Sequence, residues 1–141
     1  MIEIISRHQA VSDLKLPLVL SKVAAGFPSP ADEYIDRKLD LNEHLISHPA
    51  ATFFCRVSGD SMCDIGIIDG SLLIVDRAVS PTSGSVVLAA IDGELTCKQL
   101  DIEKQQLLPA NTRHRAIDIG DGGCEIEGVV IHAINSYAGA R

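Results

Sequence analysis

The sequence predicts a mainly β fold: a compact, strand-rich domain with a flexible N-terminal arm and two short helices. From residue 51 onward, short runs rich in Val, Ile, Leu and Thr are separated by Gly and Asp clusters, a pattern typical of strands and turns. Asp92-Gly93 lies between two such runs and is a strong signal for a two-residue hairpin loop. Before residue 51 the pattern is weaker, and the Pro-containing stretch 26–30 breaks it.

The first 50 residues are expected to hold the arm and the helices. Residues 1–25 are weakly patterned and form the arm. Ser29 can cap a helix over residues 31–39, whose apolar Ile35 and Leu39 are four positions apart. Asp40 can cap a second short helix that ends before the His-Pro pair at residues 48–49.

Six strands are expected after the helices, with the domain spanning residues 26–141. Their predicted ranges are residues 52–57, 72–76, 85–91, 94–100, 106–109 and 125–134. If Asp92 and Gly93 form the hairpin loop, Val87 faces Lys98 and Ala89 faces Thr96 across the paired strands.

Composition narrows the classes of function. The chain has 141 residues and a net charge of −7 without a Lys/Arg-rich run, which disfavours strong direct binding to DNA. No stretch approaches the roughly 20 apolar residues of a membrane span, and the N-terminus does not resemble a secretory signal. The cysteines form no C-x-x-C pair, so we expect reduced thiols in a cytoplasmic protein, with Cys55, Cys97 and Cys124 as small core residues.

Ser61 is the first candidate for chemistry. It follows a strand-like run and the turn Ser58-Gly59-Asp60, so it is either an ordinary turn serine or a nucleophile. A nucleophilic serine needs a base, and a desolvated lysine can replace the usual histidine. The backbone N–H groups of Asp60 and Ser61 could then hold a developing oxyanion.

Lys98 is the candidate base, because the predicted hairpin places it among small apolar side chains. The alternative is an edge-strand lysine whose ammonium reaches solvent. A base must be neutral, and at a reference pKa of ~10.4 only about 4 in 10,000 lysine amines are neutral at pH 7, which corresponds to about 4–5 kcal/mol. Burial disfavours the ammonium and lowers the lysine pKa.

The histidines offer rival roles. His44 and His48 are four positions apart on a predicted helix, but no third ligand accompanies them, so a solvated face is favoured and neither a metal nor a cofactor is expected. His132 lies in an apolar run and is expected to be a hydrogen-bonded core residue.

Several motifs together resemble the UmuD family, whose members are accessory subunits of error-prone polymerases and are related to self-cleaving LexA-type repressors. The matching stretches are GFPSPADEY, SGDSMCDIGIIDGSLLIVDRA, GSVVLAAIDGELTCKQL and GVVIHAI. The resemblance covers residues 26–134. The combination of S-G-D-S-M with D-G-E-x-T-x-K at this separation makes it specific.

The resemblance assigns roles to single residues. It implies a LexA/UmuD-like serine peptidase that acts on itself, with Ser61 as nucleophile and Lys98 as general base. Asp60 and Ser61 supply backbone N–H groups to the oxyanion. The Ala25-Gly26 bond matches the self-cleavage site, with Ala where UmuD itself has Cys. Cleavage would remove residues 1–25.

The resemblance also implies partners and a biological role. A RecA–single-stranded-DNA filament would stimulate cleavage, and the shortened subunit would form a homodimer and activate a UmuC-like, Y-family polymerase. The role would be translesion synthesis and mutagenesis in the SOS response to DNA damage.

Three other functions compete with this interpretation. A self-cleaving repressor would need a helix-turn-helix domain, and only 25 residues with Pro17 among them precede Gly26. A Ser-Lys peptidase acting on other proteins, like a signal peptidase, would need a membrane anchor. In a non-catalytic interaction module, Ser61 and Lys98 would have no chemical role.

Overall fold

The structure is a computed structural model that describes residues 2–7, 14–19 and 35–138. The chain divides into two compact units. The first, called here the sheet unit, comprises Met1–His8 and His48–Arg141, and the second, the hairpin unit, comprises Gln9–Ser47. The predicted boundary at residues 25 and 26 lies outside the described residues.

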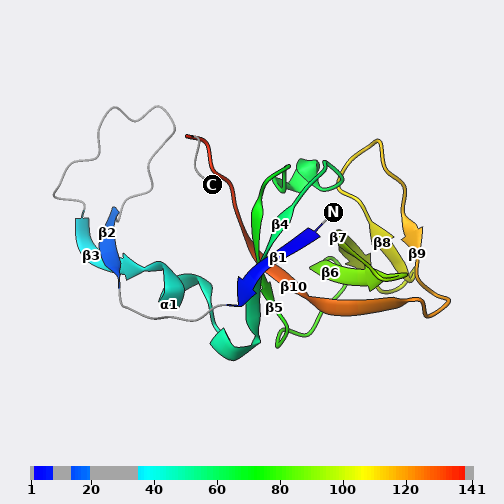
Figure 1. The fold of residues 1–141 in the computed structure, drawn as a ribbon, viewed down its shortest axis with the longest axis horizontal. Helices are drawn as coiled ribbons and strands as arrows, with labels where there is room; N and C mark the ends of the chain where they lie inside the picture. Colours follow the sequence, from blue (N-terminus) through cyan, green and yellow to red (C-terminus); the bar gives the residue numbers. More distant parts are fainter. Residues whose placement is uncertain (1, 8–13, 20–34, 139–141) are drawn as a thin grey trace. The chain divides into compact units, whose positions relative to one another are not determined.

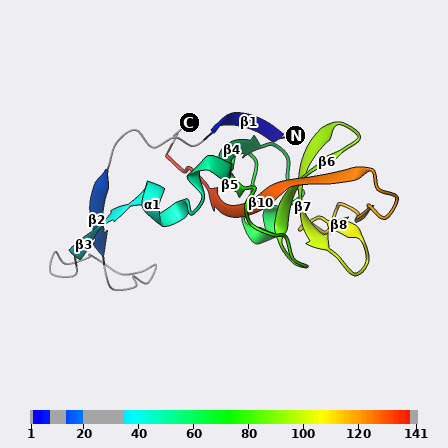
Figure 2. The same cartoon turned by 90° about the horizontal axis from the view of Figure 1, so that it is seen from below.

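The described part of the sheet unit is built on an eight-stranded antiparallel sheet (Figures 1 and 2). The strand order is β1-β4-β5-β10-β6-β7-β8-β9. The strands are β1 (Ile2–Arg7), β4 (Thr52–Val57), β5 (Leu72–Asp76), β6 (Val86–Ile91), β7 (Glu94–Asp101), β8 (Gln106–Leu108), β9 (Ile117–Asp118) and β10 (Cys124–Ile134). Short 3-10 turns cover Pro49–Ala51 and Cys63–Ile65. The predicted mainly β fold class is confirmed.

The β6–β7 hairpin has the predicted register. Val87 pairs with Lys98 and Ala89 with Thr96. Asp92 and Gly93 form the loop with φ values of 50° and 82°. Positive φ at both positions gives the turn the twist that the two strands need, and Asp-Gly adopts it readily.

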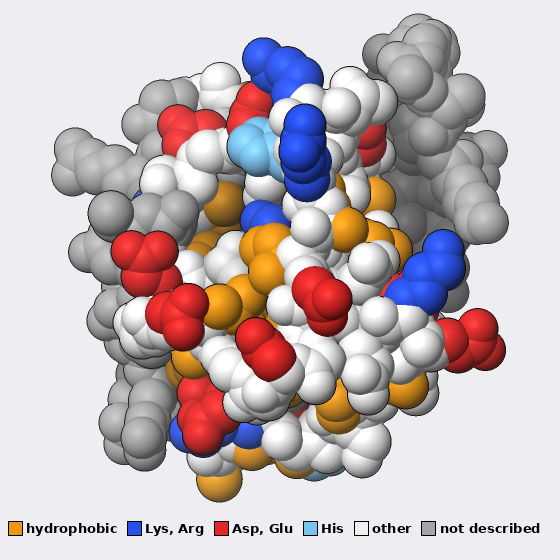
Figure 3. All heavy atoms as spheres, turned by 90° about the vertical axis from the view of Figure 1, so that its right-hand side faces the viewer, with side chains coloured by type: hydrophobic (Ala, Val, Ile, Leu, Met, Phe, Trp, Pro, Cys, Tyr) orange, Lys and Arg blue, Asp and Glu red, His pale blue; other side chains and the backbone are white. Residues whose placement is uncertain are grey.

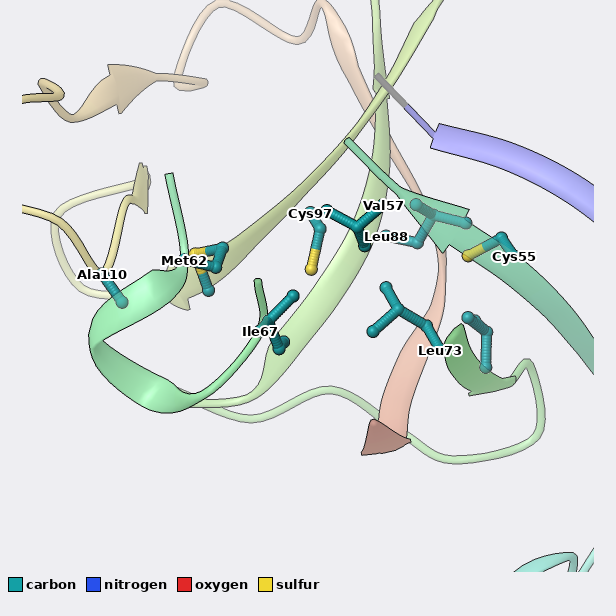
Figure 4. Close-up of a cluster of buried hydrophobic side chains, with 9 residues drawn as sticks. Cys55, Val57, Met62, Ile67, Leu73, Leu88, Cys97 and Ala110 are labelled. Atoms are coloured by element: carbon teal, nitrogen blue, oxygen red, sulfur yellow. The ribbon is translucent and has the colours of Figure 1, made fainter. Parts of the chain in front are cut away.

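Two apolar clusters form the core of the sheet unit. One gathers Cys55, Met62, Leu73, Leu88 and Cys97 with their neighbours (Figure 4). The other gathers Val87, Ala89, Leu100, Leu107 and Val129. Cys55 and Cys97 are buried as predicted, and Cys124 is half-buried and packs against the second cluster. All four cysteines are free thiols.

The hairpin unit corrects one prediction and confirms another. β2 (Lys15–Val19) pairs with β3 (Ile35–Asp40), so the predicted helix over residues 31–39 is wrong from Ile35 onward. Apolar residues four positions apart fit one face of a regular strand as well as of a helix, and pairing with β2 shows that this segment is a strand. The predicted second helix is confirmed as α1 (Leu41–Leu45), where the Asp40 side chain accepts a hydrogen bond from Asn42 N.

Within the predicted N-terminal arm the structure describes two strands, β1, which pairs with β4, and β2, which pairs with β3. One further expectation fails, because His132 is exposed rather than in the core. Beyond Val129, β10 pairs with β5 but no longer with β6, so its last residues lie outside the buried part of the sheet.

Acidic residues outnumber basic ones by 19 to 12, which gives the net charge of −7. On the face in Figure 3, acidic side chains surround a central strip of apolar ones, and basic and His side chains gather above it. No helix among the described residues is both long and apolar enough to cross a membrane.

Candidate active site

Ser61 and Lys98 lie in contact in the sheet unit, and the two residues are called here the Ser61–Lys98 pair. The Lys98 Nζ atom lies 2.6 Å from the Ser61 Oγ atom and hydrogen-bonds to it. Ser61 lies in the turn between β4 and the 3-10 turn Cys63–Ile65, and Lys98 lies in the middle of β7. The fold therefore brings the two residues singled out from the sequence into direct contact.

Strand pairing explains why the lysine lies in an apolar setting. β7 lies between β6 and β8, which rules out the alternative of an edge-strand lysine. Lys98 is opposite Val87, which is fully buried, and only 8% of Lys98 is exposed. The predicted small apolar neighbours on this face are confirmed.

The surroundings of Lys98 favour its neutral form. Burial lowers the pKa of the Lys98 amine from its ordinary value of 10.5. The Nζ atom also donates to the carbonyl of Cys97 at 3.2 Å. No carboxylate among the described residues forms an ion pair with Lys98. The neighbouring Cys97 thiol, whose pKa burial raises to about 11, supplies no counter-charge at neutral pH.

The turn that carries Ser61 is anchored on both sides. Gly59 has a φ of 98°, which favours glycine, and its N–H donates to the Asp69 carboxylate at 3.0 Å. Met62, next to Ser61, is 1% exposed and packs into the first core cluster near Ala110 and Ile67 (Figure 4). The serine is thus held by a buried side chain at the following position.

The carboxylate of Asp60 faces two basic side chains. His114 Nε2 lies 2.9 Å from Asp60 Oδ1, and Arg113 Nη2 pairs with Asp60 Oδ2. The hydrogen bond with His114, helped by the charge of Arg113, lowers the pKa of Asp60. Sequence reasoning missed these partners and the neighbouring Asn111. The Asp60 carboxylate is therefore bound by Arg113 and His114, and it forms no described hydrogen bond with Ser61 or Lys98.

The other residues singled out from the sequence lie as follows. The Ser61 N–H, a predicted oxyanion donor, makes no hydrogen bond to any described residue. Ala25 and Gly26 lie outside the described residues. His44 lies on α1, whereas His48 pairs with Asp76 at 2.6 Å. Within the described part of the chain, no group of three or more His, Cys, Asp or Glu side chains could hold a metal ion.

The chain is similar to several curated bacterial proteins over most of its length. Protein ImpA of Salmonella typhimurium is 45% identical over 120 residues, which cover 84% of this chain and 83% of ImpA. Protein MucA of the same organism is 43% identical over 122 residues, 84% of each chain. The LexA repressor of Glaesserella parasuis is 39% identical over 143 residues, 97% of this chain and 67% of the repressor.

A family match covers most of the chain. The family described as Peptidase S24-like matches residues 17–131, which include both members of the Ser61–Lys98 pair. The family match and the similar proteins confirm the predicted relationship to UmuD-like proteins and LexA-type repressors. The chain belongs to the Peptidase S24-like family.

Proposed function

We propose that this protein is a serine peptidase that cleaves its own chain, with Ser61 as nucleophile and Lys98 as general base. The observation that carries the proposal is the 2.6 Å hydrogen bond between Lys98 Nζ and Ser61 Oγ. Burial of the amine supports the same assignment, since it lowers the pKa of Lys98. Membership of the Peptidase S24-like family is the independent support.

The proposed reaction has two halves. Neutral Lys98 accepts the Ser61 hydroxyl proton while Oγ attacks the carbonyl carbon of Ala25, and the oxyanion is held by the backbone N–H groups of Asp60 and Ser61. The Ala25–Gly26 C–N bond breaks as Lys98 returns a proton to the Gly26 nitrogen. A water molecule then gives a proton to Lys98 and attacks the ester. When the Ser61–Ala25 bond breaks, Lys98 reprotonates the serine oxygen.

Cleavage would divide the chain into residues 1–25 and residues 26–141. Ala25 and Gly26 are small, so the backbone between them can approach a nucleophile without a steric clash, and Gly26 tolerates a bent segment. β1 lies in the part that would be cut off. It pairs with β4 and approaches β7, and its Ile2 packs against the first core cluster. After cleavage only such noncovalent contacts would hold it.

The biological context of the proposal is the SOS response. A RecA–single-stranded-DNA filament would promote the arrangement in which the scissile bond reaches Ser61, without adding catalytic groups. The product would form a homodimer and activate a UmuC-like polymerase subunit for translesion synthesis in the cytoplasm. The relatives ImpA and MucA and the match to a LexA repressor support this context.

The test is mass measurement of the purified protein after incubation with activated RecA filament and, separately, at alkaline pH. We expect fragments ending at Ala25 and beginning at Gly26. Ser61→Ala and Lys98→Ala should stay intact, whereas Ser80→Ala and Lys104→Ala, which alter exposed residues away from the site, should be cleaved normally. An intact wild-type chain under both conditions would contradict the proposal and favour a non-catalytic interaction module.

A repressor of LexA type is the second candidate, supported by the 39% identity to a LexA repressor. It would also cleave itself, so cleavage does not separate the two. Binding of the intact chain to a specific DNA duplex at physiological salt would favour the repressor. The net charge of −7 argues against it, because phosphate contacts come mainly from Lys and Arg.

A further inference from the structure

The segment that follows β8 holds the Ser61 turn through the backbone. Ala110 N–H donates to the Ser61 carbonyl at 2.8 Å, and Asp64 N–H donates to the Ala110 carbonyl at 2.8 Å. These two bonds join residues about 50 positions apart and fix where the turn lies. They leave open how the peptide between Asp60 and Ser61 is rotated.

A side chain of the same segment engages that peptide. Asn111 Nδ2 donates to the Asp60 carbonyl oxygen at 2.8 Å. The Asp60 carbonyl and the Ser61 N–H belong to one planar peptide group, and the described chain contains no cis peptide bond. In a trans peptide the C=O and N–H bonds point in opposite directions. Holding the Asp60 oxygen therefore sets the direction of the Ser61 N–H.

The Asn111 amide is itself held in one orientation. Its side-chain oxygen accepts from Arg113 N at 2.6 Å, and its nitrogen also contacts the Cys63 sulfur at 3.4 Å. Asn111 is only 9% exposed. A buried amide with both ends engaged cannot rotate freely, so it offers Asp60 a fixed donor.

The Ser61 N–H, whose direction Asn111 sets, has no acceptor among the described residues and can therefore bind a ligand. It belongs to a half-buried residue whose hydroxyl contacts Lys98. Backbone N–H groups beside a nucleophile stabilise an oxyanion best when their direction is fixed before the reaction.

We propose that Asn111 is a positioning residue that aims the Ser61 N–H at the oxyanion formed during cleavage. The proposal rests on the proposed self-cleavage and deepens it. Asn111 touches neither the Ser61 hydroxyl nor Lys98 in the hydrogen bonds described, so it acts through the peptide alone. Cys63 N–H also donates to the Asp60 carbonyl, at 3.1 Å, so the turn keeps one tether when Asn111 is changed.

The test compares the pH dependence of self-cleavage in wild type and Asn111→Ala. Removing an oxyanion donor outright costs about 100–1,000-fold in rate, so loss of its orientation should cost about 10–100-fold. We expect the plateau rate at alkaline pH to fall by this factor while the midpoint of the profile stays in place, because Lys98 keeps its surroundings. A shifted midpoint with an unchanged plateau would show that Asn111 acts through Lys98 and would overturn the proposal.

A second variant distinguishes the effect of the Asn111 hydrogen bond to Asp60 from that of its hydrogen bond with Arg113. Asn111→Asp keeps an acceptor for Arg113 N but has no N–H for the Asp60 carbonyl, so we expect it to be at least as slow as Asn111→Ala. A wild-type plateau in Asn111→Asp would assign the effect to the Arg113 contact and overturn the proposal.

Asn135→Ala is the matched control. Asn135 bridges the other end of the same loop by donating to the Gly66 carbonyl at 3.0 Å and accepting from Ser71 Oγ. We expect a comparable loss of stability to urea but a plateau within about threefold of wild type. An equal loss of rate in Asn135→Ala would make the Asn111 effect merely structural.

If wild type cleaves and Asn111→Ala cleaves equally well, only this inference fails, whereas an uncleaved wild type refutes the proposed function itself.

Discussion

The Lys98 amine nitrogen lies 2.6 Å from the Ser61 hydroxyl oxygen, although the two residues are 37 positions apart in the sequence. The β6–β7 hairpin positions the lysine, and the anchored turn after β4 positions the serine. Because the amine is buried among apolar side chains without a described carboxylate partner, its position favours proton acceptance rather than a permanent charge. The predictions below test this relationship and the fold that produces it.

Lys98→Arg should abolish self-cleavage. The guanidinium group stays protonated at all accessible pH values, so it cannot accept the Ser61 proton although it retains a positive charge and hydrogen-bond donors. We expect a loss of at least about 1,000-fold in the rate of cleavage, measured by gel densitometry with Lys104→Arg as control. Cleavage by Lys98→Arg at the wild-type rate would remove the lysine from the mechanism.

Lys98→Met should stabilise the protein at neutral pH. Burial lowers the pKa of Lys98 in the folded protein below its ordinary value of 10.5. At a pH between the folded-state pKa and 10.5, the unfolded chain therefore binds more protons than the folded protein. The free energy of unfolding of wild type therefore rises with pH in this window. Urea titrations should show the advantage of Lys98→Met at pH 7 shrinking as the pH approaches 10.5. An advantage independent of pH would contradict the lowered pKa.

His48→Ala should destabilise the sheet unit by about 2–3 kcal/mol, because it removes a partner from a buried carboxylate. Asp76 is fully buried, and its two oxygens are bound by His48 Nδ1 at 2.6 Å and Ala78 N at 2.8 Å. The His48 side chain is 49% exposed, so water can replace part of the lost bond. His44→Ala, at an exposed position, should change the free energy of unfolding by less than about 0.5 kcal/mol. Equal effects of the two substitutions would refute the role of the pair.

Gly128→Ala should destabilise the protein by about 1–3 kcal/mol through overpacking. A Cβ atom at Gly128 would lie 2.6 Å from the Val75 Cγ1 atom and 3.4 Å from the Asp76 carbonyl oxygen. Gly123→Ala is the control, since a Cβ there meets only the Asp121 carboxylate, at 3.6 Å. Chemical denaturation of both variants checks the prediction. An unchanged free energy of unfolding in Gly128→Ala would indicate that β10 lies further from β5 than the structure shows.

Sequence reasoning succeeded where a short-range signal fixed a long-range contact. Asp92-Gly93 sets the hairpin register, and the register places Lys98 opposite Val87 on a buried face. It failed where one pattern fits two structures. The apolar spacing of four in residues 35–39 fits a regular strand as well as a helix. The strand that pairs with this segment, β2, lies in a stretch with little patterning of its own.

The supporting residues of the site carried no local signal. Asn111, Arg113 and His114 are 51 to 54 positions from Asp60, in a stretch of turn-like composition. The stretch follows β8, which pairs with β7, and backbone hydrogen bonds of Ala110 join it to the Ser61 turn. Strand β1 lies in the weakly patterned stretch predicted as the arm, and its pairing with β4, far along the chain, had no local signal.

The most direct measurement is an NMR titration of the lysine side chains in full-length Ser61→Ala, which stays uncleaved, set beside the pH profile of wild-type self-cleavage. The Lys98 resonance should titrate below those of the other lysines, and cleavage should speed up from neutral to alkaline pH with a midpoint close to that titration. A Lys98 resonance that titrates with the others near the ordinary value of 10.5, or a flat cleavage profile between about pH 7 and 10, would contradict a neutral lysine as the base that activates Ser61.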